Sequence, residues 1–237
     1  MDGERRVLTE HMKLTRRRFA AALAFAPIAA RAAGDGEGQA FDLRADDGDP
    51  LANFRIPAEL DPAQLPGVIW AGPEGADVSI YEFYDYNCSY CRVAARELDG
   101  ILRADAGLRL GLVNDPILSL GSVQCAKIQQ AILRLSGPRV AYDFHLRLFT
   151  KPGRKDGPFA LDLAREMGLN VAKVEESADA KSVSETLARQ ARLSSALGMA
   201  TTPSFIVAGV GVLGWPGARS LQAMVADARR CDRPLCR

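Results

Sequence analysis

Two cysteines separated by two residues stand between an apolar segment and an amphipathic one. Residues 78–84 are rich in β-branched and aromatic side chains, which predicts a strand. After Cys91 the apolar residues recur at helical spacing, which predicts a helix beginning at or near Cys88. Unpaired N–H groups and the positive dipole end of such a helix favour a thiolate. The pattern therefore predicts a redox dithiol in which Cys88 is the exposed nucleophile and Cys91 resolves the mixed disulfide.

A Cys-x-x-Cys pair also forms half of many zinc sites, so a metal site is the first alternative. The further His and Cys residues are His11, Cys125, His145, Cys231 and Cys236. His11 lies in a segment expected to be removed, and the last two cysteines lie far along the chain in another context. We therefore expect no metal ligand set and no bound cofactor. A module whose dithiol binds a soft ion such as Cu(I) or Zn²⁺ stays open as the alternative function.

Three further residues have types that could take part in chemistry. Glu82 lies among large apolar side chains of the predicted strand, where a carboxyl has a raised pKa and could relay the proton of Cys91. An exposed or lysine-paired Glu82 at the strand end is the alternative. His145 adjoins an apolar helical stripe, which favours a hydrogen-bonded core histidine over a catalytic base. Cys125 lies on another such stripe, where free Cys acts as a small buried hydrophobe.

The N-terminal segment has the composition of an export signal. Residues 1–32 combine a basic start, a short apolar stretch and a small-residue cleavage site. Paired arginines at 16–18 before Phe19 indicate the twin-arginine type, with an ordinary secretory signal as the alternative. No apolar run approaches the roughly 18 residues of a membrane-spanning helix. Without residues 1–32 the chain has 23 basic and 26 acidic side chains, so nothing indicates nucleic-acid binding.

The last two cysteines flank a short polar segment at the C-terminal end. Cys231 and Cys236 are predicted to form a local disulfide that fixes the tail to the last helix, because both lie in the exported part, where disulfides persist. A second redox pair that passes electrons to the first is the functional alternative.

The chain of 237 residues reads as one interrupted α/β domain. Residues 33–65, rich in Gly, Asp and Pro, are expected to form a flexible segment with one short helix after Pro57. The predicted strands are 68–70, 77–84, 108–113, 204–207 and 210–213. The predicted helices are 88–106, 123–135, 140–149, 159–167, a short piece near 171, 181–197 and a closing helix around 221–228.

This β-β-α-β order, an all-helical block and then β-β-α resemble a thioredoxin fold with a helical insertion, as in the DsbA family of thiol–disulfide oxidoreductases. Tyr-Asp-Tyr-Asn-Cys-Ser-Tyr-Cys is similar to the active sites of its ScsC-like group. The resemblance implies a first thioredoxin-like part at 66–114, an insertion at 115–198, a second part at 199–230 and a tail at 231–237.

The resemblance also implies a substrate groove. Thr201-Thr202-Pro203-Ser204-Phe205 resembles the loop whose cis-proline faces the dithiol, so Thr202 and Pro203 are expected to form the other wall. An ordinary trans bond leading into the strand is the alternative. Ser89 and Tyr90 replace the Pro-His pair of strongly oxidising DsbA. Substrates are expected to use the backbone at Thr202 and apolar surface near Tyr86 and Tyr90.

The expected protein is therefore a periplasmic protein-disulfide oxidoreductase, with oxidase activity favoured over isomerase activity because residues 33–65 supply no evident oligomerisation arm. Its expected partners are unfolded or partly folded exported proteins and a membrane thiol-redox protein that recycles the dithiol.

Overall fold

A six-stranded sheet forms the centre of the described chain. The computed structural model describes residues 40–199 and 201–236, so the expected signal peptide and the start of segment 33–65 lie outside the described residues. The strands stand in the order β1-β6-β5-β3-β4-β2, with β3 and β4 parallel and all other neighbours antiparallel. Their bounds are β1 Asn53–Arg55, β2 Ile69–Ala71, β3 Val78–Tyr84, β4 Leu108–Asn114, β5 Ser204–Val207 and β6 Val210–Leu213.

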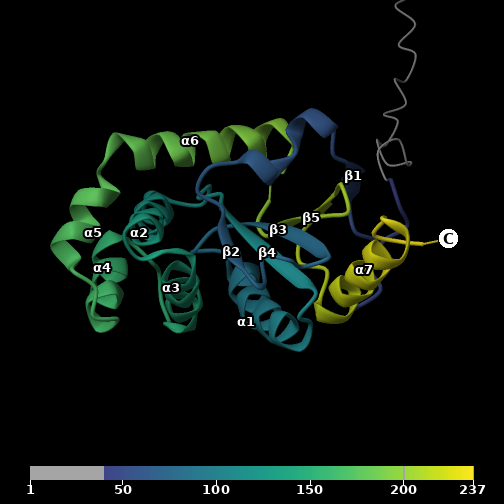
Figure 1. Ribbon diagram of the computed structural model, residues 1–237, viewed down its shortest axis with the longest axis horizontal. Helices are drawn as coiled ribbons and strands as arrows, with labels where there is room; N and C mark the ends of the chain where they lie inside the picture. The colour runs from purple at the N-terminus through teal and green to yellow at the C-terminus, as the bar shows by residue number, and fades with distance from the viewer. Residues whose placement is uncertain (1–39, 200, 237) are drawn as a thin grey trace, which may run out of the picture. The chain divides into compact units, whose positions relative to one another are not determined.

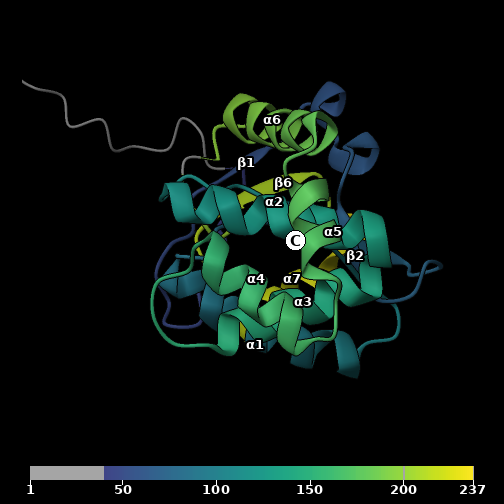
Figure 2. The ribbon, with the colours of Figure 1, turned by 90° about the vertical axis from the view of Figure 1, so that its left-hand side faces the viewer.

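Helices cover both faces of the sheet and extend one end of it. The α-helices are α1 Ser89–Ala104, α2 Leu120–Ser136, α3 Pro138–Thr150, α4 Gly157–Glu166, α5 Val171–Ala178, α6 Lys181–Ala196 and α7 Ala218–Cys231. In Figure 1, α1 and α7 lie below the sheet and α6 lies above it. The helices α2, α3, α4 and α5 gather at one end, at the left in Figure 1 and toward the viewer in Figure 2. The expected order of two α/β parts around an all-helical insertion is confirmed.

The alternation of β3 decides which of its side chains lie beneath α1. Ile80 and Tyr84 belong to the core that includes the buried residues of α1, whereas Tyr81 and Phe83 belong to the core on the other face. Because successive strand residues point to opposite faces, Glu82 shares the α1 face with Ile80 and Tyr84. The strand thus directs a carboxyl toward the helix that begins with the dithiol.

The segment before β2 differs from expectation. Residues 53–55 form β1, which pairs with β6 at the edge of the sheet, so the expected flexible segment contributes a strand. The buried Asn53 amide accepts the N–H of Phe41 and donates to the carbonyls of Phe41 and Leu51. Two 3-10 turns follow, at Ala58–Leu60 and Pro62–Gln64, where one short helix was expected. Hydrogen bonds to distant residues, which local composition does not reveal, therefore order this segment.

The tail beyond α7 is closed by a disulfide between Cys231 and Cys236, with their Cα atoms 6.1 Å apart. Within residues 40–199 and 201–236, none of the helices combines the length and apolar character that a bilayer crossing needs.

Candidate active site

Cys88 is the N-cap residue of α1. Its extended backbone (φ −80°, ψ 124°) turns the chain into the helix, and its Sγ accepts the N–H of Cys91 at 3.3 Å. Its thiol also lies 3.1 Å from the Thr202 carbonyl oxygen, to which it donates. Neither Cys88 nor Cys91 is disulfide-bonded, so the site is in its dithiol form. Free N–H groups of the first helical turn thus face the sulfur, as anion stabilisation requires.

The two thiols have opposite pKa shifts. A hydrogen bond from the Cys91 thiol, assisted by the Cys91 backbone N–H, lowers the pKa of Cys88 from 9.0 to about 6, against the opposing effect of burial. Burial, then the hydrogen bond to Cys88 and the nearby charge of Glu82, raises the pKa of Cys91 well above its usual value. At neutral pH Cys88 is therefore the thiolate and Cys91 the thiol.

Cys88 was expected to be an exposed nucleophile, but it is largely buried. Only 7% of the residue is accessible, because its Sγ is enclosed between the first turn of α1 and Thr202. Its accessible part lines a groove of about 630 Å³. Cys91 is fully buried behind it. An incoming sulfur can thus reach Cys88 from the groove, whereas it cannot reach Cys91.

Glu82 is fully buried, and neither carboxyl oxygen has a hydrogen-bond partner among the described residues. Burial, followed by the charge of Cys88, raises the pKa of Glu82 from 4.5 to about 8. The alternative of an exposed or lysine-paired glutamate is wrong. At neutral pH this carboxyl is mostly protonated, and it interacts electrostatically with both cysteines.

Aromatic rings surround the side of the site that faces the insertion. His145 is buried against Tyr84, Tyr86 and Phe149, with ring centroids 4.7, 5.8 and 4.9 Å away. Burial lowers the pKa of His145 to about 3, so the ring is neutral. The expected core histidine is confirmed, but its expected hydrogen bond is not found at Nδ1, which has no partner within the described chain. The apolar rings leave no acceptor there.

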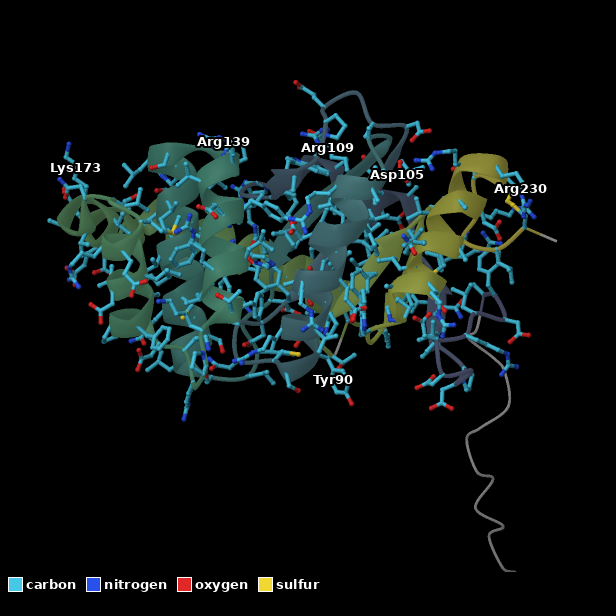
Figure 3. The ribbon with its side chains drawn as sticks, turned by 90° about the horizontal axis from the view of Figure 1, so that it is seen from below. Tyr90, Asp105, Arg109, Arg139, Lys173 and Arg230 are labelled. Carbon is cyan, nitrogen blue, oxygen red and sulfur yellow. A yellow bond between two sulfur atoms is a disulfide. The ribbon has the colours of Figure 1, made fainter. Side chains whose placement is uncertain are left out.

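The five residues expected to bind substrate occupy different positions around the groove. Ser89 is exposed and lines the groove, and the neighbouring Tyr90 is 65% exposed and projects from the surface (Figure 3). Thr202 and Pro203 are mostly buried on the other side of Cys88, and the bond between them is cis, as expected. Tyr86 lines the groove, but its side chain is buried among aromatic rings and so exposes less surface than expected.

Asp85 and Asn87, to which no role was assigned from the sequence, hold the two loops that complete the groove. The buried Asp85 carboxylate accepts the N–H of Asn87, the N–H of Leu118 and the hydroxyl of Ser122. Asn87 Nδ2 donates to the carbonyl of Lys155 at 3.0 Å, and its Oδ1 accepts the N–H of Lys155 at 2.7 Å. The cysteine loop is therefore joined to segments more than 30 and more than 60 residues away.

The groove has an apolar rim that sequence reasoning also missed. Large exposed apolar side chains follow β4, at Ile117, Leu118 and Leu120, and Leu118 lines the groove with Cys88. Ile117 and Leu118 lie in the connection before α2, and Leu120 is the first residue of that helix. No periodicity marks this connection in the sequence, and the hydrogen bond from the Leu118 N–H to Asp85 is what holds it beside the cysteine loop.

The remaining cysteines lie outside the groove. Cys125 is fully buried, and burial raises its pKa to about 12, which confirms the expected core position. Cys231 and Cys236 are bonded to each other. Across the described ranges no three His, Cys, Asp or Glu side chains are placed to share a metal ion.

The chain is similar in sequence and fold to known thioredoxin-like proteins. Residues 64–227 match a family model described as Thioredoxin. A thioredoxin-like oxidoreductase from Silicibacter pomeroyi DSS-3 is 34% identical, with a TM-score of 0.65, over 70% of this chain and 94% of that structure.

Two further structures share the fold at lower identity. The thiol-disulfide exchange protein alpha-DsbA2 from Wolbachia pipientis is 21% identical, with a TM-score of 0.64, over 68% of this chain and 87% of its own. The catalytic domain of Proteus mirabilis ScsC is 18% identical, with a TM-score of 0.64, over 71% and 92%. A curated relative, the Na(+)/H(+) antiporter NhaA of Herminiimonas arsenicoxydans, is 29% identical over 181 residues, which are 75% of this chain but only 28% of that relative's length.

Proposed function

This chain belongs to the thioredoxin family, and we propose that it oxidises cysteine pairs in exported polypeptides through Cys88 and Cys91. The resemblance to DsbA-like thiol–disulfide oxidoreductases expected from the sequence is confirmed by the family match and by its structural neighbours. One observation carries the proposal: a thiol of lowered pKa lines an open groove at a helix N-terminus, while its partner thiol is buried behind it.

The proposed reaction starts from the disulfide form of the site. A substrate thiolate attacks Cys88 Sγ, the Cys88–Cys91 bond breaks, and Cys91 leaves as a thiolate. Glu82, protonated at neutral pH, donates a proton to that thiolate. A second substrate thiolate then attacks the substrate sulfur of the mixed disulfide and releases the Cys88 thiolate. The substrate loses two electrons to form a disulfide, and the two cysteines of the site gain them.

The lowered pKa of Cys88 supports the oxidising direction. At pH 7 a thiol of pKa about 6 is stabilised in the reduced protein by about 1.4 kcal/mol relative to one of pKa 9.0. Because two electrons are transferred, this raises the reduction potential by about 30 mV. The site therefore accepts electrons more readily than an unperturbed dithiol.

The surroundings of the groove support an unfolded polypeptide as substrate. Tyr90 and Leu118 are 65% and 53% exposed, and Ile117 and Leu120, close to Leu118 along the chain, are exposed as well. Exposed apolar patches of this kind bind extended chains without strict sequence requirements. Thr202, whose carbonyl lies 3.1 Å from the Cys88 sulfur, places backbone polar groups beside the reacting atom. Substrate contacts at Thr202 and Pro203 are part of the proposal.

We place the reaction in the periplasm, with a membrane thiol-redox protein reoxidising the dithiol. The support is the paired-arginine segment at 16–18 and the presence of all five cysteines after residue 32, where disulfides would persist.

The test is oxidative refolding of a reduced, disulfide-containing protein by the oxidised full chain. We expect wild-type protein to restore the client's disulfides and Cys88→Ala to lose this activity completely. Cys125→Ala, which removes a buried thiol outside the groove, is the matched control and should retain it. Wild-type activity in the Cys88→Ala variant would refute the proposal, and a measured potential near about −270 mV would refute the oxidising direction.

A further inference from the structure

The groove that contains Cys88 has a positive charge that disulfide exchange alone does not require. Its only charged lining residues are Arg92 and Arg154, and no carboxylate lines it within the described chain. Both arginines are exposed. Among residues 40–199 and 201–236, no acidic side chain lies within ion-pair distance of either guanidinium, and neither guanidinium donates a hydrogen bond to another described residue. Two cations without counter-ions among the described residues thus line the groove that contains the reactive sulfur.

Arg92 is positioned by α1 itself. It is four residues after Cys88, and its backbone N–H bonds to the Cys88 carbonyl at 3.3 Å, so both residues lie on the same side of the first turn. It also lines a second cavity of about 370 Å³ between α1 and α3. Arg92 is therefore shared by the groove and this second cavity.

Arg154 is positioned by a loop that is fixed at two points. Asn87 pairs with both backbone groups of Lys155, and the fully buried Lys155 ammonium donates to the carbonyls of Lys151 and Gly153. No carboxylate in the described part of the chain pairs with Lys155, whose ammonium is held by these two carbonyls alone. Burying an ammonium group without partners costs free energy, so the hydrogen bonds to these carbonyls are needed to stabilise the buried Lys155 side chain.

We propose that Arg92 and Arg154 form a carboxylate subsite that selects cysteine-containing segments with an acidic residue close to the reacting cysteine. This inference rests on the proposed function and specifies its substrate class. Guanidinium groups bind carboxylates in paired hydrogen bonds, and they are more weakly hydrated than an ammonium group, which lowers the cost of binding. The apolar rim, in contrast, does not distinguish acidic from basic chains. The groove therefore selects by charge next to the sulfur and by apolar surface farther away.

The first test uses the thiolate as a local probe in the reduced full chain. Iodoacetamide is neutral and iodoacetate is anionic, and both react with the same Cys88 thiolate, so their rate ratio reports the local charge independently of the pKa. We expect Arg92→Gln and Arg154→Gln each to lower the iodoacetate-to-iodoacetamide ratio about threefold, and the double variant about tenfold, at low salt. Arg139→Gln removes an equal charge at the opposite edge of the molecule from Tyr90 (Figure 3) and should leave the ratio unchanged.

The second test measures oxidation of three synthetic dithiol peptides that differ only beside one cysteine, with Glu, Gln or Lys. We expect kcat/KM in the order Glu, Gln, Lys for the wild type and for Arg139→Gln, and loss of most of this preference in the double variant. Oxidation of none of the peptides would instead refute the proposed function. Equal oxidation of all three by the wild type would refute the carboxylate subsite alone. Should the double variant lose only its reaction with glutathione, a small anionic thiol, the polypeptide substrate class would be overturned.

Discussion

Cys88 lies at the N-terminus of α1, next to unpaired backbone N–H groups and the Cys91 thiol. This position determines the pH at which its thiol is deprotonated. Because hydrogen bonds lower its pKa to about 6, the thiolate fraction should rise through pH 6 and level off above pH 7. We expect the iodoacetamide rate at Cys88, followed by mass spectrometry from pH 4 to 9, to have its midpoint near pH 6. The Cys91→Ala variant removes the largest cause of the shift, so its midpoint should move upward.

Cys125→Ala removes a thiol that has no contact with Cys88 in the groove and should leave the midpoint unchanged. A wild-type midpoint near 9, the value of an unperturbed thiol, would contradict the assignment of Cys88 as the nucleophile.

Glu82 should make the fold less stable as the pH rises. Folding raises its pKa from 4.5 to about 8, so the unfolded chain releases this proton at lower pH than the folded chain does. The stabilising effect is therefore fully present below pH 4.5 and is lost as the pH rises toward 8. We expect the wild type to lose about 3 kcal/mol of unfolding free energy between pH 5 and pH 8 relative to Glu82→Gln.

Urea unfolding of the two reduced proteins at both pH values measures this difference, since the contribution of Cys88 is common to both. Glu176→Gln, at an exposed position of α5, is the control and should follow the wild type. Parallel pH dependence of wild type and Glu82→Gln would show that Glu82 does not titrate in this range.

At the scale of elements, Asn87 connects the start of α1 to the loop before α4 and to the start of α2. Its amide makes hydrogen bonds with Lys155 and with the hydroxyls of Ser119 and Ser122. We expect Asn87→Ala to lower the unfolding free energy by about 3 kcal/mol, because buried partners lose their bonds. Trypsin should then cut faster after Arg154 and Lys155.

Asn170→Ala serves as the matched control, because Asn170 caps α5 through one bond to the N–H of Lys173. That variant should lose about 1 kcal/mol and show no faster cleavage after Arg154. An Asn87→Ala protein no less stable than this control would mean that the loop is held by other contacts.

Helices and strands could be predicted where their residue pattern extends over many positions, and less well where it extends over few. The strand at 78–84 is rich in β-branched and aromatic residues, the helix after Cys88 has clear helical periodicity, and the structure contains both. The three-residue β1 has too few residues for alternation, and it becomes a strand only by pairing with β6. Tyr86 follows the strand in a loop, so no period indicated that its ring is buried.

The dithiol was predictable from one local motif, whereas the groove was not. Cys88, Cys91 and Glu82 lie within ten residues of one another, and strand and helix geometry relate them directly. Leu118 and Arg154 come from segments 30 and 66 residues after Cys88, and hydrogen bonds to the side chains of Asp85 and Asn87 place those segments beside the cysteine loop. The spacing of residues in the sequence does not indicate such long-range hydrogen bonds.

At the scale of the whole molecule, a buried polar network joins the insertion to the sheet. Asn114, at the end of β4, donates to Tyr84 and Gln129 and accepts from Gln130, and its backbone N–H bonds to Gln190 of α6. All five residues are buried. Because each partner would be unsatisfied without the others, we infer that sheet and insertion depend on each other for stability.

This dependence predicts a single unfolding transition seen by two probes. Both tryptophans, Trp70 and Trp215, lie outside the insertion, whereas the insertion contains five of the seven described α-helices. Tryptophan fluorescence and far-UV circular dichroism should therefore give the same urea midpoint. Asn114→Ala should lower the unfolding free energy by about 3 kcal/mol, because buried amides lose their partners. Gln222→Ala, on the exposed side of α7, should change it by less than about 0.5 kcal/mol. A wild-type fluorescence midpoint that differs from the circular dichroism midpoint would show that the insertion unfolds separately, and that the network orients the two parts without coupling their stability.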